Sequence, residues 1–235
     1  MLQVPPDDTP IRIVCATRVP AERFFLDTHT GRTLAAFKAI SNAELSLYPN
    51  NSTALSAVYN HAIELTREAA RILVFIHDDC VIADYFWAQR IRDGLRQFDL
   101  LGVVGNVRRV PRQPSWIILD PVTGQQDAYT NLSGAIGQGT RFPPERLDAF
   151  GPVGRACRLI DGVFIAGYSE TLHRTGLRFD PEFAFHFYDM DFCRSAERLQ
   201  LTIGTIPLAL VHASMGSLDQ RWRDAYERYL GKWQD

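Results

Sequence analysis

The chain has 235 residues, of which 46% are hydrophobic and 22% are charged. This length and composition favour one α/β domain with a sizeable buried core and exclude a largely disordered chain. The formal net charge of −2 provides no strong positive field, so a nucleic-acid polymer is excluded as the expected partner.

The expected cellular setting is the cytoplasm. The first ten residues lack the basic and apolar segments of a secretion signal, and no stretch reaches the roughly 20 apolar residues that span a bilayer. The cysteines form no Cys-x-x-Cys pair, so neither a zinc knuckle nor a disulfide scaffold is expected; they are Cys15, Cys80, Cys157 and Cys193.

Strands and helices are predicted to alternate over the first half of the chain. A buried strand at residues 11–16 is followed by a helical segment to about residue 40 and a strand at 43–48. A helix from Ser52, capped by Asn51 or Ser52, leads to a nearly continuous apolar run at 71–77, which is typical of a central parallel strand. A helix at 84–98 and a strand at 100–107 complete an open, mostly parallel sheet flanked by helices.

The second half is less regular. Between residues 110 and 158 we predict at most a hairpin near 116–124, and the glycine-rich stretch 134–139 is predicted to be a mobile loop. A buried strand at 159–166 is interrupted by Asp161 and Gly162. Further predicted elements are a helix at 170–175, a helix from the acidic segment 186–191 to about 199, and strands at 201–206 and 208–211.

A closing helix is predicted at residues 217–233, with Ser217 and Gln220 at capping-box spacing. Its aromatic stripe, which includes Trp222, Tyr229 and Trp233, can pack on the core or on a second copy of the chain. Both alternatives stay open, and the second would make the protein a homo-oligomer.

Two acids stand at the exit of the central strand. Ligands of open α/β sheets bind outside the carboxyl ends of the strands, where Asp78 and Asp79 are expected. Carboxylates are ligands suited to Mg²⁺ or Mn²⁺, which commonly bridge a protein to nucleotide phosphates. The alternative is that Asp79 caps the next helix while Asp78 is solvated.

A second acidic pair precedes the helix that ends near residue 199. Asp189 and Asp191 point in different directions on a helix, and Asp189, at its start, is the better placed to take a proton from a sugar hydroxyl. Asp191 is predicted on the acceptor side or paired with Arg194. The alternative for Asp189 is a helix cap with a salt bridge.

Two further positions are candidates for the site. His212 follows an apolar strand and either completes a divalent-metal site or is structural. Asp161 lies inside a buried run, which is costly for an acid unless it is paired or faces a ligand, and Gly162 allows close approach of a backbone or a substrate. We therefore consider Asp161 and Gly162 as acceptor-binding residues.

Taken together, the segments LSAVYNHAI, VFIHDDCVI, DLLGVVGN, LIDGVFIA, FHFYDMDFCRSAERLQLTIG and PLALVHASMGS occur in one order along the chain. In that order they resemble the GT-A glycosyltransferases of the family 2-like group, which includes a streptomycin-biosynthesis glycosyltransferase-like domain. The resemblance covers nearly the whole chain.

The resemblance implies the nucleotide-diphospho-sugar transferase fold and a hexosyltransferase-like activity. It implies a single domain whose residues 1–109 bind the nucleotide of an NDP-sugar, with UDP favoured, and whose residues 110–235 bind a saccharide or other hydroxyl acceptor. Mn²⁺ or Mg²⁺ would be held by Asp79 and His212, and Asp189 would be the base of an inverting displacement. The implied nucleotide-binding residues are Cys15, Ala16, Thr17, Arg18, Tyr48, Asn51, His77 and Asp78. His77 stands where the family's Asp-x-Asp motif begins with an acid.

Two other functions stay open. A metal-dependent nucleotidyltransferase or hydrolase would also use Asp79, although the chain has no G-x-x-x-x-G-K phosphate loop. A non-catalytic nucleotide-sugar-binding module would keep the fold without the chemistry, because fold does not fix function.

Overall fold

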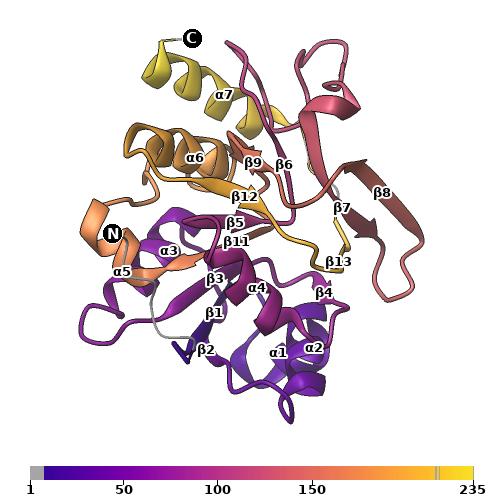
Figure 1. Cartoon of the computed structure of the whole chain (residues 1–235), viewed down its shortest axis with the longest axis vertical. Helices are drawn as coiled ribbons and strands as arrows, with labels where there is room; N and C mark the ends of the chain where they lie inside the picture. Colours follow the sequence, from indigo (N-terminus) through magenta and orange to yellow (C-terminus); the bar gives the residue numbers. More distant parts are fainter. Residues whose placement is uncertain (1–7, 215, 217, 235) are drawn as a thin grey trace.

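Two β-sheets with helices packed around them form the fold (Figure 1). The structure is a computed structural model, and it describes residues 8–214, 216 and 218–234. Within these residues, no helix has the length and apolar character needed to cross a membrane.

The first sheet has seven strands in the order β2-β1-β3-β11-β5-β12-β9. These are β1 (Ile11–Ala16), β2 (Glu44–Tyr48), β3 (Ile72–Ile76), β5 (Leu100–Gly102), β9 (Ala156–Cys157), β11 (Phe164–Tyr168) and β12 (Ile203–Thr205). All residues of β3 are buried, as its apolar run predicted. The central position of this strand is therefore confirmed.

The predicted mostly parallel arrangement needs correction, because this sheet is mixed. β1 is parallel to β2 and β3, and β12 is parallel to β5, but β11 is antiparallel to both of its neighbours. An apolar run shows that a strand is covered on both faces, but it does not show the direction of the strand.

The second sheet has the strand order β10-β6-β7-β13-β4, with β8 added beside β7. These strands are β4 (Cys80–Ile82), β6 (Val104–Asn106), β7 (Leu132–Gln138), β8 (Arg146–Gly151), β10 (Leu159–Ile160) and β13 (Leu210–His212). The glycine-rich stretch predicted as a loop lies mostly in β7. Gly134 is required there, because a Cβ at this position would lie 2.0 Å from the Val103 carbonyl oxygen.

Two runs predicted as single strands are each divided between the sheets. The run 100–107 forms β5 in the first sheet and β6 in the second, and the run 159–166 forms β10 in the second and the start of β11 in the first. The interruption at Asp161 and Gly162 is thus the crossover from one sheet to the other.

Helices cover the sheets. α3 packs on β1, α4 on β5 and β11, α5 on β11, α6 on β10 and α2 on β4. The helices are α1 (Phe24–Asp27), α2 (His29–Phe37), α3 (Leu55–Glu64), α4 (Trp87–Leu95), α5 (Ser169–Thr175), α6 (Tyr188–Arg198) and α7 (Gln220–Trp233), with 3-10 turns η1 (Ala21–Arg23) and η2 (Tyr129–Asn131).

Both helix caps proposed from the sequence differ from the structure. α3 begins at Leu55 without a side-chain cap, while the Asn51 side chain bonds Thr53 in the preceding loop. α7 is capped by Asp219, whose Oδ1 accepts from the Trp222 amide at 2.9 Å. Ser217, the predicted cap, lies outside the described residues.

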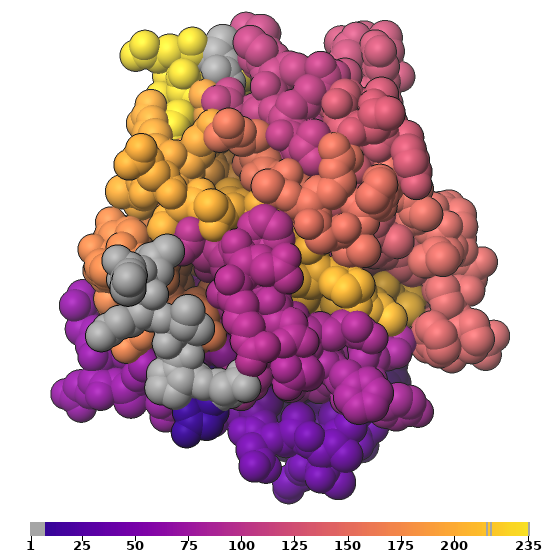
Figure 2. All heavy atoms as spheres, in the orientation of Figure 1, coloured from indigo at the N-terminus to yellow at the C-terminus, as the bar shows by residue number. Residues whose placement is uncertain are grey.

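The apolar stripe of α7 is buried on the core of the same chain, which was one of its two predicted environments. α7 lies beside α6 at one end of the molecule, and α1 and α2 lie at the other (Figure 1). In the same view, the magenta atoms of α4 at the centre lie beside the yellow atoms of the segment after β12 (Figure 2), where a Cβ at Gly94 would meet Ile206.

Candidate functional site

The candidate site lies where the chain crosses between the two sheets. After β3 the chain passes through His77, Asp78 and Asp79 into β4 of the second sheet. β13 pairs with β4 so that His212 is opposite Cys80, and the Ala213 amide donates to the Asp79 carbonyl at 3.1 Å. Strand register therefore brings His212 beside Asp79, although the two are far apart in sequence.

The crossover at Asp161–Val163 lies against the same place. β11 pairs with β3 so that Phe164 is opposite Ile76, and the His77 amide donates to the Val163 carbonyl at 3.3 Å. The Asp161 amide donates to the Val104 carbonyl at 3.2 Å. Polar residues from these two crossovers are thus gathered at one edge of the fold.

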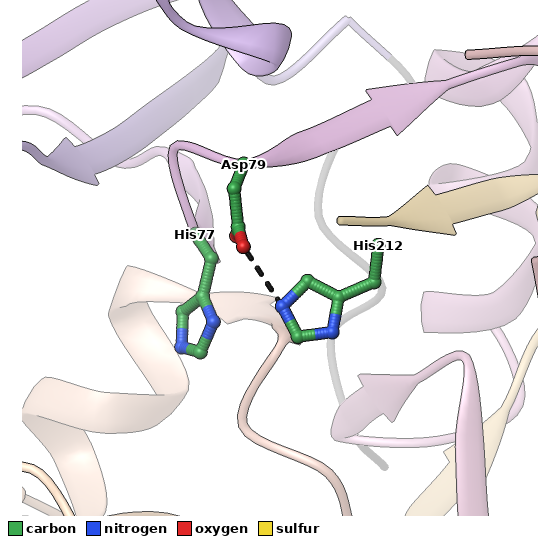
Figure 3. Close-up of side chains that lie close together, drawn as sticks. All are labelled: His77, Asp79 and His212. Carbon is green, nitrogen blue, oxygen red and sulfur yellow. Dashed lines mark ion pairs between the residues drawn. The ribbon is translucent and has the colours of Figure 1, made fainter. Parts of the chain in front are cut away.

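Three side chains of this edge form a cluster suited to a metal ion. His77, Asp79 and His212 each offer one ligand atom, and these atoms lie within 4.8 Å of one another. Figure 3 shows the three side chains pointing toward one another, with Asp79 between the two rings. His212 Nε2 lies 3.3 Å from Asp79 Oδ1. One carboxylate and two imidazoles are a donor set that Mn²⁺ and Zn²⁺ accept.

The charge states of the cluster also fit a cation. Burial raises the pKa of Asp79, but the hydrogen bond and charge of His212 outweigh it, so the pKa lies well below its ordinary value. Burial and the charge of His212 lower the pKa of His77. Asp79 is therefore anionic and His77 neutral near pH 7, which are the forms that bind metals.

The pKa of His212 shifts in the other direction from that of His77. Burial lowers its pKa, but the hydrogen bond to Asp79 and the charge of Asp79 raise it above the ordinary value. A proton on His212 and a metal ion would therefore compete for the same nitrogen beside Asp79.

A cavity of about 690 Å³ opens beside this cluster. Its floor is formed by the ends of β1 and β3 and the start of α3, with Ala16, Thr17, Arg18 and Asn51 among its lining residues. Thr17 Oγ1 donates to Asp78 Oδ2 at 2.5 Å, which ties the first strand to the acidic pair. The volume of the cavity suits a small-molecule ligand.

Two predicted nucleotide-binding residues do not reach this cavity. Cys15 is fully buried, with 0% exposure, because both faces of the sheet are covered at this strand: Val14, on the opposite face, is also 0% exposed. Burial also raises the pKa of its thiol. The Tyr48 hydroxyl is 2.8 Å from His61 Nδ1 and is not among the described residues that line the cavity. We drop Cys15 and Tyr48 from the site.

Asp189 occupies the first turn of α6 and is partly buried. Its Oδ2 accepts from the Gly162 amide at 3.0 Å, and its Oδ1 accepts from the Met190 amide at 2.9 Å. Burial, together with the charge of Asp161, raises the pKa of Asp189 to about 7. Asp189 is not among the described residues that line the cavity.

No protein-family model and no curated protein sequence matches the chain. Among solved structures, GalNAc-T7 with UDP, GalNAc and Mn²⁺ matches with a TM-score of 0.54 and 10% sequence identity, over 95% of this chain and 48% of that one. The protein A197 from STIV matches with a TM-score of 0.47 and 9% identity, over 88% and 87% of the two chains. GalNAc-T7 is a GT-A glycosyltransferase. The fold is GT-A-like.

This chain thus spans about half the length of GalNAc-T7. At 10% identity the likeness concerns the fold alone. His77 and Asp79, which follow β3, line the cavity, and His212 completes the cluster beside it.

The predicted acceptor-side residues have different environments. Asp161 Oδ2 accepts from Trp116 Nε1 at 2.5 Å, and its Oδ1 accepts from the Val163 amide, so this acid is partnered within the fold. Asp191 is 0% exposed, with its carboxylate 2.5 Å from Lys232 Nζ and bonded by Trp233 Nε1. This acid holds α7 and has no access to an acceptor, so we drop it from the acceptor site.

Sequence reasoning missed several residues of the site. α7 contributes Arg221, Asp224 and Arg228 to the cavity wall, and the Ser214 amide donates to Asp79 Oδ2 at 3.1 Å. The three α7 residues recur on its polar face at spacings of three and four, which is a signal that the sequence carried. Phe185, which stacks on His77 at 6.4 Å between ring centroids, carried no such signal.

Proposed function

We propose that this protein is a metal-dependent glycosyltransferase that moves a sugar from a nucleotide-sugar donor to an acceptor hydroxyl. The observation that carries the proposal is the cluster of His77, Asp79 and His212 at the edge of a 690 Å³ cavity in a GT-A-like fold. GalNAc-T7, which shares this fold, was solved with UDP, GalNAc and Mn²⁺.

In this proposal the donor lies in the cavity with its base and ribose over Ala16, Thr17, Arg18 and Asn51. Thr17 holds Asp78 in place for contact with the nucleotide. His77 joins Asp79 and His212 as a third metal ligand, in place of the nucleotide contact expected from the sequence. A divalent ion bound there would neutralise charge on the departing diphosphate.

Asp189 is proposed as the general base that takes the proton of the acceptor hydroxyl. A pKa raised to about 7 suits this role, because a base works best when its pKa is near the working pH. A single displacement with one base would invert the configuration at the anomeric carbon. Asp161 is proposed to lie on the acceptor side of the site, where its charge raises the pKa of Asp189.

The test measures UDP or GDP release from a panel of NDP-sugars with Mn²⁺ and simple saccharide acceptors. Asp189→Asn is expected to lose about 10²- to 10⁴-fold in turnover while keeping donor affinity. Asp79→Asn is expected to weaken Mn²⁺ binding in a titration without donor. The matched control is Glu68→Gln, an exposed acid outside the site, which keeps both. Equal turnover of Asp189→Asn and wild type would overturn the proposal.

One observation favours a second function, that of a non-catalytic nucleotide-sugar-binding module. Both oxygens of Asp189 already accept backbone hydrogen bonds, and the described residues that line the cavity do not include it. Under this function, the wild type binds an NDP-sugar with Mn²⁺ but releases no nucleotide. The same assay therefore separates the two.

A further inference from the structure

Tyr188, which precedes the proposed base, is buried between His77 and Gly162. Its side chain is 4% exposed. The hydroxyl lies 3.0 Å from His77 Nε2 and donates to the Gly162 carbonyl at 2.8 Å. One hydroxyl thus joins the metal cluster to the crossover between the sheets.

The positions of the protons in these two hydrogen bonds follow from the donors and acceptors present. The Gly162 carbonyl can only accept, and Tyr188 has one proton. Both hydrogen bonds form only if Tyr188 donates to Gly162 and His77 Nε2–H donates to Tyr188. The Nδ1 atom of neutral His77 then carries the lone pair.

This lone pair belongs to the ring nitrogen that faces the cluster. Figure 3 shows one nitrogen of His77 on the side of Asp79 and His212 and the other turned away from them. The nitrogen bonded to Tyr188 is Nε2, which leaves Nδ1 as the nitrogen on the cluster side. Phe185 stacks on one face of the His77 ring, with an angle of 20° between the two ring planes.

We propose that Tyr188 is a positioning residue that holds His77 in the Nε2–H tautomer, so that Nδ1 is directed at a divalent cation. The proposal rests on the proposed metal-dependent function. A hydrogen-bond partner on the far nitrogen of a histidine ligand fixes the tautomer and the ring orientation. An acid at position 188 would accept from His77 as well but could not also donate to Gly162 while ionised.

Gly162 extends the arrangement to the proposed base. Its carbonyl accepts from Tyr188, and its amide donates to Asp189 Oδ2 at 3.0 Å. A Cβ at this position would lie 2.3 Å from the Tyr188 hydroxyl oxygen and 3.0 Å from Asp189 Cβ. The glycine found inside the apolar run 159–166 is therefore required by Tyr188 and Asp189, and the two backbone polar groups of this one residue link Tyr188, the partner of His77, to the proposed base.

The first test is the affinity of the metal-free 235-residue chain for Mn²⁺, measured by electron paramagnetic resonance of the free ion. Tyr188→Phe removes only the hydroxyl and is expected to lower the affinity by about 10- to 100-fold. The matched control is Tyr226→Phe, which removes another buried hydroxyl, one that donates to the Arg112 carbonyl. This control should keep wild-type affinity. Equal affinity of Tyr188→Phe and wild type would overturn the proposal.

The second test reads the tautomer in the wild type itself, and His77→Gln serves only to assign its signals. Imidazole ¹⁵N NMR of the metal-free chain should show His77 with its proton on Nε2, and His77→Gln identifies the signals. Tyr188→Phe should give a mixture of tautomers. A proton on Nδ1 in the wild type would overturn the proposal.

The two proposals fail in different ways. If the wild type binds no Mn²⁺, or if Asp79→Asn binds it as tightly as the wild type, the proposed function fails. If Asp79→Asn loses Mn²⁺ while Tyr188→Phe keeps it, the function stands and the role of Tyr188 fails.

Discussion

Asp161 and Asp189 are two carboxylates close enough for one to influence the ionisation of the other. The charge of Asp161 adds to burial in raising the pKa of Asp189, and hydrogen bonds from backbone amides only partly offset this. Each carboxylate has hydrogen-bond donors of its own, from Trp116 and Gly162 respectively. The folded protein therefore holds a weakly acidic carboxyl group whose ionisation is costly.

The cost of ionising Asp189 should appear in the pH dependence of stability. Its pKa is raised from 3.8 to about 7, so the stabilisation by the protonated form is complete below about pH 4 and is lost as the pH rises through about 7. The variant Asp189→Asn has no ionisable group at this position, so it should not lose stability in this pH range for this reason. In the metal-free state the difference in unfolding free energy between Asp189→Asn and the wild type should move in favour of the variant by on the order of 1–3 kcal/mol between about pH 5 and about pH 8.

Urea unfolding of the wild type and Asp189→Asn at about pH 5 and about pH 8 measures this difference. Glu68→Gln is the control, since this acid is exposed. A difference that stays constant with pH would contradict the raised pKa.

At the residue scale, the sequence predicted those site residues that stand directly at strand ends. Asp79 and His212 were both proposed in this way, and the structure brings their side chains together. His77 was given another role, although residues i and i+2 of an extended segment point to the same side. Tyr188 and Gly162 could be understood only from the packing of α6 on the crossover, which no local pattern encodes.

At the scale of the elements, α7 is linked to α6 by a charged cluster in which Asp191 is buried and Lys232 is partly exposed. Asp191 on α6 is 0% exposed and lies 2.5 Å from Lys232 on α7, while Lys232 also reaches Asp180 at 2.6 Å. Trp233 donates to the same Asp191 carboxylate at 2.9 Å. Because α7 also forms a wall of the cavity, this cluster positions Arg221 and Arg228 at the proposed donor site.

Lys232→Met should be strongly destabilising. The substitution keeps much of the apolar stem but leaves Asp191 buried without its cation, which costs about 3–5 kcal/mol. The double variant Lys232→Met/Asp191→Asn should recover part of the loss, because the buried charge is then absent. Urea unfolding measures both variants. If Lys232→Met lowers the unfolding free energy by less than about 1 kcal/mol, the pair Lys232–Asp191 contributes little to stability.

The order of helices and strands was largely predictable, but their distribution between sheets was not. Periodicity placed β1, β2, β3 and most helices close to their observed bounds. The run 100–107 has no polar residue before Asn106, yet the chain leaves one sheet at Val103 and enters the other. Both segments are buried, and hydrophobicity does not record which neighbour buries a strand.

At the scale of the whole molecule, the cavity joins parts of the chain that are distant in sequence. Its walls come from the end of β1, the start of α3, the segment 184–186 and α7. The predicted division into a nucleotide-binding half, 1–109, and an acceptor-binding half, 110–235, stays a prediction. The lining shows, however, that residues of both halves face the same space.

A ligand in this cavity should therefore stabilise early and late segments together. UDP and Mn²⁺ at about 100 times the dissociation constant would raise the unfolding free energy by about 2.7 kcal/mol. Hydrogen exchange should slow in residues 16–18, 51–55 and in α7, because all of them line the cavity, while β8 should be unchanged. Hydrogen exchange of the full chain with and without UDP and Mn²⁺ measures this, and Asp79→Asn should show little slowing. Protection of the segments 16–18 and 51–55 without α7 would mean that the closing helix takes no part in binding the donor.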